Sequence, residues 1–178
     1  MYRLVKPIVL CGFMASGKTT VGKLAARRWN LPIYDTDKLI VSKTGKSISA
    51  IFAEKGEAFF RDVEHEICRE VASYPPCIIS SGGGLLTYSR NGDLLQGKTV
   101  IVLLNRDFDT IWSFLSNCTD RPLVTQKKKD GILALYESRI PLYRKYADFE
   151  IENTSGPEKC VDILEQNLMK QGLLLSEM

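Results

Sequence analysis

One stretch near the N-terminus, VLCGFMASGKTTVGKLAA (residues 9–26), constrains the fold more than any other part of the chain. An apolar run typical of a buried strand ends at Gly12, and residues 12–19 match the pattern G-x-x-x-x-G-K-[ST] without a gap. Apolar residues at helical spacing follow, namely Val21, Leu24 and Ala25. A strand, a glycine loop and a helix in this order are typical of phosphate-binding loops.

The chemistry of phosphate explains this pattern. Phosphate oxygens need several backbone N–H groups aimed at one point, and glycine lets the loop curl and the ligand approach closely. The helix that begins near Lys18 adds the partial positive charge of its N-terminus. Lys18 can reach the β and γ phosphates, and Thr19 can offer a hydroxyl to Mg²⁺. A chance match occurs on the order of once in a hundred such chains, so we interpret the loop as a site for ATP or GTP.

The remaining chain alternates between strand-like and helix-like segments. We expect strands within residues 7–12, 31–37, 75–84, 99–105 and 147–153. We expect helices at 18–29, 37–55 (broken at 44–47, where Gly45 is a plausible stop), 57–73, 107–116, 131–146 and 157–171. The continuous apolar run TVIVLLN is typical of a strand buried on both faces of a parallel sheet. The pattern predicts an α/β fold with a five-stranded parallel sheet, followed by a loose tail at 172–178.

Composition narrows the class of protein. A net charge of +3 does not demand nucleic acid, and no apolar run approaches the roughly 18 residues of a membrane span. The chain has five cysteines without a C-x-x-C pair and one histidine, so a zinc site is not expected. Most of the cysteines lie in apolar surroundings and are expected to be buried, reduced thiols. The first expected strand leaves no room for a signal peptide, so the cytoplasm is the expected compartment.

Two acidic residues and an arginine are candidates for binding a phosphate acceptor. Asp35 and Asp37 point the same way if the strand persists, so one could hold Mg²⁺ and the other could orient a hydroxyl for attack. An acidic turn that caps the next helix is the alternative. Arg61 can be fixed by Glu64 one turn further along a helix, although a solvated salt bridge is the other interpretation.

A glycine turn completes this candidate site. Ser80 and Ser81 precede Gly82, Gly83 and Gly84 directly after an expected strand. Three glycines weaken any regular element, so they favour backbone that passes close to a ligand. A merely flexible turn is the alternative.

Together the motifs GFMASGKTT, DTD, FRDVE, SGGG, RPL and RIPLY resemble the shikimate kinases, within the nucleoside-monophosphate-kinase branch of P-loop proteins. The resemblance extends from about residue 7 to 165. It implies a three-layer α/β/α fold with strand order 2-3-1-4-5 and a mobile lid at about 116–130. It also implies that residues 1–178 form one kinase domain, with an acceptor-binding helical region at about 36–64.

The resemblance implies transfer of the γ-phosphate of ATP to the 3-hydroxyl of shikimate, with Mg²⁺, in aromatic amino-acid biosynthesis. Asp37 would bind the accepting hydroxyl, Asp35 would lie near Mg²⁺ with Thr19 as a direct ligand, and Arg61 and Arg139 would grip the carboxylate. The glycine turn 82–84 would offer backbone to the ring hydroxyls. The residues expected to bind the nucleotide are Gly12, Ala15, Ser16, Gly17, Lys18, Thr19, Thr20, Arg121 and Pro157. Lys18, Asp37 and Arg121 are the expected catalytic residues.

The lid and the base site carry less support from the residues themselves. The resemblance implies that Arg121, in the polar segment 116–130, closes onto the phosphates and excludes water. From the residues alone, Arg121 is interpreted as a solvated loop charge. Ala15 stands where the family usually has glycine, and we expect small effects. Phe114 stands where the family commonly has an arginine that stacks on adenine; a phenyl ring can also stack. The lysine run 127–129 is interpreted as a solvated lid charge, with nonspecific attraction of phosphate as the alternative.

Other functions remain open at this point. A gluconate or nucleotide kinase would share the phosphate loop, and gluconate is also a carboxylated polyol. A non-catalytic binder would be expected to lose Lys18, Asp37 or Arg61, all of which are present. ATP hydrolysis without an acceptor is disfavoured because the acceptor site is complete. We expect a monomer whose partner is a small molecule, with no nucleic acid and no membrane.

Overall fold

A computed structural model describes residues 2–117 and 128–176. Its centre is a five-stranded parallel sheet with the order β3-β4-β2-β5-β6. These strands are β2 (Ile8–Cys11), β3 (Ile33–Asp35), β4 (Ile78–Ser80), β5 (Val100–Asn105) and β6 (Phe149–Glu152). Numbered among themselves along the chain, they follow the order 2-3-1-4-5, so this prediction is confirmed.

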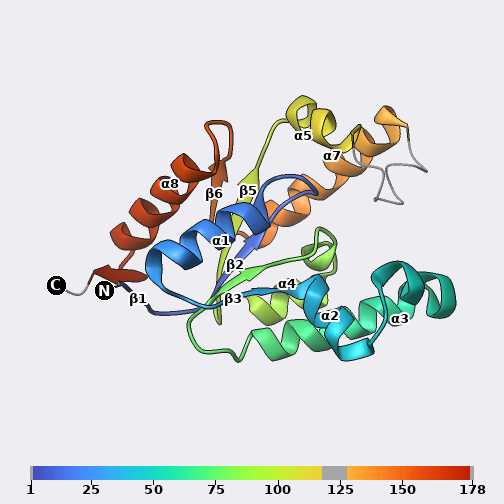
Figure 1. The fold of residues 1–178 in the computed structure, drawn as a ribbon, viewed down its shortest axis with the longest axis horizontal. Helices are drawn as coiled ribbons and strands as arrows, with labels where there is room; N and C mark the ends of the chain where they lie inside the picture. Colours follow the sequence, from blue (N-terminus) through green and yellow to red (C-terminus); the bar gives the residue numbers. More distant parts are fainter. Residues whose placement is uncertain (1, 118–127, 177–178) are drawn as a thin grey trace.

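Helices cover both faces of the sheet (Figure 1). One face packs against α1 (Lys18–Trp29) and α8 (Pro157–Lys170). The other packs against α2 (Thr36–Thr44), α3 (Ile48–Val71), α4 (Ser89–Leu95), α5 (Phe108–Leu115) and α7 (Lys129–Tyr146), with a 3-10 turn η1 at Leu85–Thr87. Residues of β2 alternate between the two cores, because successive side chains of a strand point to opposite faces. Both faces of β2 and β5 are buried, which explains their continuous apolar sequence.

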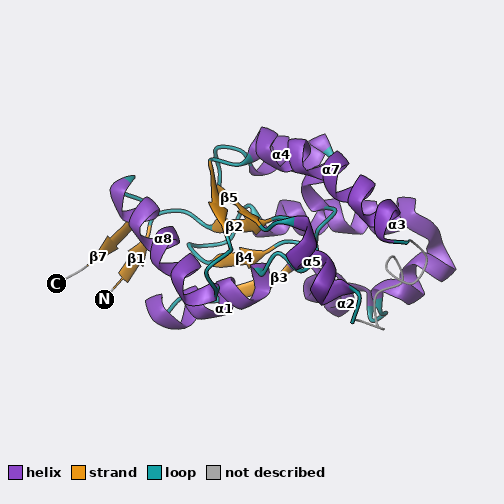
Figure 2. Cartoon of the chain, turned by 90° about the horizontal axis from the view of Figure 1, so that it is seen from above, coloured by secondary structure: helices purple, strands orange, loops and turns teal. Residues whose placement is uncertain are grey.

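The helical region after β3 follows the expected pattern. Gly45 ends α2 in the left-handed conformation, with φ of 67°. After the break at 44–47 the helix resumes at Ile48, and Gly56, with φ of 78° and ψ of 175°, separates this segment from the next one, as expected from the separate helices 37–55 and 57–73. The two segments of α3 therefore meet at Gly56, and Glu57 starts the segment that carries Arg61. Both α2 and α3 extend away from the sheet in Figure 2.

The expectation of a loose tail is wrong for residues 174–176. Leu174–Ser176 forms β7, which pairs antiparallel with β1 (Tyr2–Leu4) and brings the two ends of the chain together (Figure 1). Leu4 and Leu174 are buried in the core that α1 and α8 share. This small sheet lies at the end of the molecule away from α2 and α3 (Figure 2).

Four of the five cysteines lie in the described residues, and all four are buried, free thiols: Cys11, Cys68, Cys77 and Cys160. Burial raises the pKa of each thiol, to about 12 for Cys11 and Cys68 and about 11 for the other two. Cys118 lies outside the described residues. Within the described part of the chain, no helix is long and apolar enough to span a membrane.

Candidate active site

The glycine loop lies between β2 and α1, at the edge of the sheet where all five parallel strands end. Gly12 has φ of 143°, and a Cβ there would lie 2.4 Å from the carbonyl oxygen of Leu104. Gly17 has φ of 99°, and its Cβ would lie 2.4 Å from Nδ2 of Asn153. Both positions therefore require glycine for conformation and for space.

Lys18 is folded into this loop. Its ammonium group donates hydrogen bonds to the carbonyl oxygens of Gly12, at 2.9 Å, and Phe13, at 2.8 Å, and the residue is 9% exposed. The positive charge is thus held at the loop itself, where the helix N-terminus also favours an anion.

Thr19 and Asp35, the two candidate magnesium residues, lie next to each other. Oγ1 of Thr19 lies 3.4 Å from Oδ2 of Asp35 and 3.1 Å from Oγ of Ser80. Neighbouring oxygen ligands of an octahedral Mg²⁺ lie about 3 Å apart, so these oxygens fit the edges of such a site. No cluster of three or more acidic, histidine or cysteine side chains suited to a metal occurs among residues 2–117 and 128–176.

The expected geometry of the two aspartates is wrong in one respect. The strand does not persist to Asp37, because β3 ends at Asp35 and α2 begins at Thr36. Oδ1 of Asp35 caps α2 by accepting hydrogen bonds from the N–H groups of Asp37, at 3.1 Å, and Lys38, at 3.3 Å. The capping and metal interpretations are therefore compatible, since Oδ2 of Asp35 faces Thr19.

Asp37 lies against the glycine turn. A Cβ on Gly82 would be 2.5 Å from Oδ1 of Asp37, and the N–H of Gly82 donates to Oγ1 of Thr36 at 2.8 Å. Asp37 thus occupies the first turn of α2, and the glycine lets the turn after β4 pass directly beside its carboxylate.

The two predicted arginines meet the same turn from different helices. A Cβ on Gly84 would lie 2.6 Å from Nη1 of Arg61, in α3, and one on Gly83 would lie 3.9 Å from Nη1 of Arg139, in α7. Nη1 of Arg61 also donates to Oε2 of Glu64 at 2.9 Å, which confirms the predicted pair. Glu64 is 1% exposed; burial raises the pKa of its carboxyl, and the charge of Arg61 offsets part of that effect.

A cavity of about 230 Å³ unites most of these groups. It is lined by residues of the loop, the acidic turn and the glycine turn: Met14, Ala15, Gly17, Lys18, Thr19, Thr20, Asp35, Asp37, Ser80, Ser81, Gly82 and Gly83. The candidate phosphate, metal and acceptor residues among them therefore surround one space.

Comparison with known proteins identifies the family. The model of the shikimate kinase family matches residues 14–168. A shikimate kinase of Dehalococcoides mccartyi is 37% identical over 165 residues, covering 92% of this chain and 93% of the relative. One of Dictyoglomus turgidum is 38% identical over 161 residues, covering 87% and 93%. The chain belongs to the shikimate kinase family.

Solved structures of shikimate kinases match the fold. The enzyme from Acinetobacter baumannii in complex with shikimate superposes with a TM-score of 0.86 at 30% identity, covering 93% of this chain and 94% of that one. The enzyme from Aquifex aeolicus gives 0.79 at 35% identity, covering 94% and 98%. A gluconokinase from Sinorhizobium meliloti gives 0.61 at 18% identity, which is a likeness of fold alone.

Two departures from the pattern of shikimate kinases, Ala15 and Phe114, and two further predicted residues, Pro157 and Arg121, concern the nucleotide side. Ala15 has φ of 60°, a left-handed conformation that costs a residue with a side chain about 1–2 kcal/mol. Phe114 is 53% exposed in α5, with the guanidinium of Arg106 5.3 Å from its ring centroid. Pro157 begins α8 and does not line the cavity described above. Arg121 and most of the predicted lid lie outside the described residues.

Two residues that support the loop were missed by the sequence reasoning. Nδ2 of Asn153 donates to the carbonyl oxygen of Ser16 at 2.9 Å, and its Oδ1 is buried without a hydrogen-bond partner among the described residues. Arg106 donates to the carbonyl oxygens of Asn153, at 3.0 Å, and Ala15, at 3.4 Å. The one available signal was position. Arg106 directly follows the predicted strand 99–105 and Asn153 ends the predicted strand 147–153, which places both at the carboxyl ends of the parallel strands, where the loop also lies.

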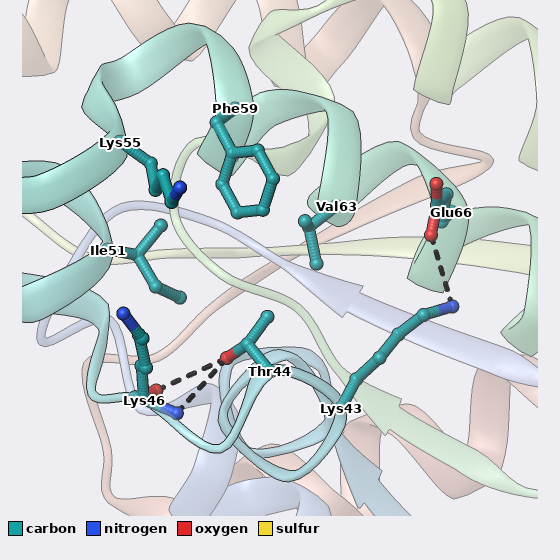
Figure 3. Close-up of a pocket in the computed structure, with 8 residues that line it drawn as sticks. All are labelled: Lys43, Thr44, Lys46, Ile51, Lys55, Phe59, Val63 and Glu66. Carbon is teal, nitrogen blue, oxygen red and sulfur yellow. Dashed lines mark hydrogen bonds and ion pairs between the residues drawn. The ribbon is translucent and has the colours of Figure 1, made fainter.

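A larger cavity, of about 360 Å³, lies between α2 and α3 and holds none of the predicted site residues (Figure 3). Ile51, Phe59 and Val63 give it an apolar wall, and Lys43 at its rim pairs with Glu66 at 3.2 Å. Because it lacks phosphate-binding backbone and candidate catalytic groups, we assign the reaction to the smaller cavity.

Proposed function

We infer that the protein transfers the γ-phosphate of ATP to the 3-hydroxyl of shikimate. The observation that carries this proposal is the position of Asp37, Arg61 and Arg139 around one glycine turn that borders the phosphate loop. An acid that can orient a hydroxyl and two cations that can hold a carboxylate suit a hydroxylated carboxylic acid. Membership of the shikimate kinase family and likeness to a shikimate complex support the same acceptor.

On the nucleotide side, the loop N–H groups and the N-terminus of α1 would hold the phosphates. Lys18 would leave the carbonyl oxygens that it contacts and bind the β and γ phosphates, stabilising charge on the transferred group. Thr19 and Asp35 would hold Mg²⁺, the latter directly or through water. The metal would neutralise negative charge on the phosphate oxygens during transfer.

On the acceptor side, Asp37 would accept a hydrogen bond from the reacting hydroxyl and orient it in line with the γ-phosphate. Arg61 and Arg139 would hold the carboxylate, since a guanidinium pairs with a carboxylate through two parallel hydrogen bonds. Glu64 keeps Arg61 aimed at the glycine turn, because it holds Nη1 from the buried side. The backbone of Gly82–Gly84 would contact the ring hydroxyls.

Further roles in the reaction are proposed on the resemblance. Arg121 in the lid would close onto the phosphates and exclude water. Phe114 would stack on the base, and the contact of its ring with Arg106 supports an aromatic and cationic surface there. Gly12, Ala15, Ser16, Gly17 and Thr20 would complete the phosphate site, with Pro157 near the base. We further propose one kinase domain that works as a monomer in the cytoplasm.

A coupled assay of ADP release tests the proposal. Purified protein is given Mg-ATP with shikimate, gluconate, a panel of nucleoside monophosphates or no acceptor. We expect ADP release that requires shikimate. Release with gluconate alone would keep the mechanism and overturn the acceptor, and release without any acceptor would make the protein an ATPase. Arg61→Ala and Arg139→Ala should each raise the KM for shikimate; wild-type kinetics in either variant would contradict the carboxylate clamp.

A further inference from the structure

We propose that Glu57 is a specificity-determining residue of the acceptor site. Its carboxylate binds Arg61 until the carboxylate of the acceptor displaces it. Oε1 of Glu57 accepts hydrogen bonds from Nε of Arg61, at 3.2 Å, and from Nη2, at 3.1 Å. It also accepts a hydrogen bond from the hydroxyl of Tyr88 at 3.2 Å. The proposal rests on the carboxylate clamp proposed above.

The two carboxylates on Arg61 differ in the freedom of their side chains. The side chain of Glu64 is 2% exposed and holds Nη1 from within the core, so it is a fixed partner. The side chain of Glu57 is 59% exposed and sits directly after the break at Gly56. An exposed pair four residues apart on a helix is weak, so Glu57 can leave at small cost while Glu64 stays.

The surroundings of Glu57 are those that an acceptor carboxylate would meet. Its pKa is held below the ordinary value mainly by the hydrogen bonds from Arg61, with Tyr88 and the charge of Arg139 adding to the effect. The carboxylate therefore lies in the field of both arginines of the proposed clamp. One anion in this place excludes a second, because like charges at one site repel.

Other contacts hold the guanidinium of Arg61 in place while the acceptor carboxylate replaces that of Glu57. Its guanidinium lies 4.7 Å from the ring centroid of Tyr88 and 5.0 Å from that of Phe60, and its side chain is 13% exposed. With Glu64 as a third support, the cation does not depend on Glu57 for its position. An anionic acceptor replaces one carboxylate by another, whereas a neutral acceptor cannot compete for Arg61 in this way.

Steady-state kinetics of Glu57→Gln test the proposal in the full chain. Glutamine keeps the shape and removes the charge, so we expect the KM for shikimate to fall about two- to fivefold, the range of an exposed ion pair. The kcat and the KM for ATP should not change. Glu57→Asp, which shortens the side chain, should also lower the KM for shikimate. Glu54→Gln is the matched control, since Glu54 is an exposed carboxylate of the same helix that pairs with Lys46 and should leave all constants unchanged.

The double variant Glu57→Gln, Arg61→Ala distinguishes a failure of the proposed competition from a failure of the proposed carboxylate clamp. In the Arg61→Ala background, Glu57→Gln should have a smaller effect, because the two carboxylates no longer compete for Arg61 and only the weaker influence of Arg139 and of the charge of Glu57 remains. An unchanged KM in Glu57→Gln, with a raised KM in Arg61→Ala, would overturn the competition and leave the clamp intact. A raised KM in Glu57→Gln would mean that Glu57 orients Arg61 instead. A wild-type KM in Arg61→Ala would overturn the clamp and this inference together.

Discussion

The glycine turn after β4 allows a substitution whose effect on function should far exceed its effect on stability. Gly84 has φ of −95° and ψ of −12°, a conformation that alanine adopts without strain. A Cβ there would nevertheless lie 2.6 Å from Nη1, 3.1 Å from Nη2 and 3.2 Å from Cζ of Arg61. Because such atoms need about 3.5 Å of separation, the guanidinium must move by about 1 Å. Gly84→Ala therefore displaces one half of the proposed carboxylate clamp.

The expected rise in the KM for shikimate follows from the hydrogen bond between Arg61 and the acceptor that Gly84→Ala removes. A hydrogen bond to a charged group contributes about 1.5–3 kcal/mol, so we expect the KM for shikimate to rise roughly ten- to hundredfold. The KM for ATP should stay near the wild-type value. Thermal unfolding should change little, because the clash involves the end of a flexible side chain and alanine restricts the unfolded chain by about 0.4–1 kcal/mol.

The assay is steady-state kinetics with shikimate varied at saturating Mg-ATP, together with thermal denaturation of the same preparation. Gly84→Ala in an Arg61→Ala background serves as the control, since the methyl group then meets no guanidinium and should add little to the loss. An unchanged KM for shikimate in Gly84→Ala would refute the placement of Arg61 at the acceptor. A large fall in the melting temperature would mean that the turn itself had been disrupted.

Three further predictions test other parts of the site and fold. Asp37→Asn should lower kcat about 10²- to 10⁴-fold and leave ATP binding intact by calorimetry; near-normal turnover would remove Asp37 from its role. Asn153→Ala leaves the carbonyl oxygen of Ser16 without its donor, so the KM for ATP should rise and the free energy of unfolding should fall by about 1–3 kcal/mol, measured with urea. Arg144 lowers the pKa of Glu150 through its hydrogen bonds, so this pair stabilises the fold above the unfolded pKa of about 4.3 and loses that effect as pH falls through the lower folded value. At pH 7, Glu150→Gln should therefore lower the free energy of unfolding by about 0.5–1 kcal/mol, a value reduced because the pair is partly exposed. This difference from the wild type should vanish at low pH, and a difference that stays constant with pH would contradict the assignment.

Much of the fold was predictable because long elements carry strong local signals. The apolar run of β5 and the phosphate loop after β2 each indicate their structure from neighbouring residues alone. β1 and β7 were not predicted, because strands of three residues carry almost no periodicity and their partner lies about 170 residues away. The helices on either side of Gly56 were predicted as separate segments, and the non-helical backbone of Gly56 does separate them.

The candidate site was predictable where a sequence motif or a helical spacing by itself indicates the role of a residue. Lys18, Thr19 and the Arg61–Glu64 pair follow from motif and helical spacing. The position of Asp37 depended on where β3 ends, which the capping by Asp35 decides. Asn153 and Arg106 act through contacts between strands distant in sequence, so no local pattern indicates them.

In the proposed reaction, Asp37 presents one particular hydroxyl of shikimate to the phosphate loop. The most direct test is to incubate the protein with Mg-ATP and shikimate and to locate the phosphate on the product by ³¹P–¹H correlation NMR. We expect a single product in which the phosphorus couples to the proton on carbon 3. Phosphate on another hydroxyl, or ADP accompanied only by inorganic phosphate, would contradict it.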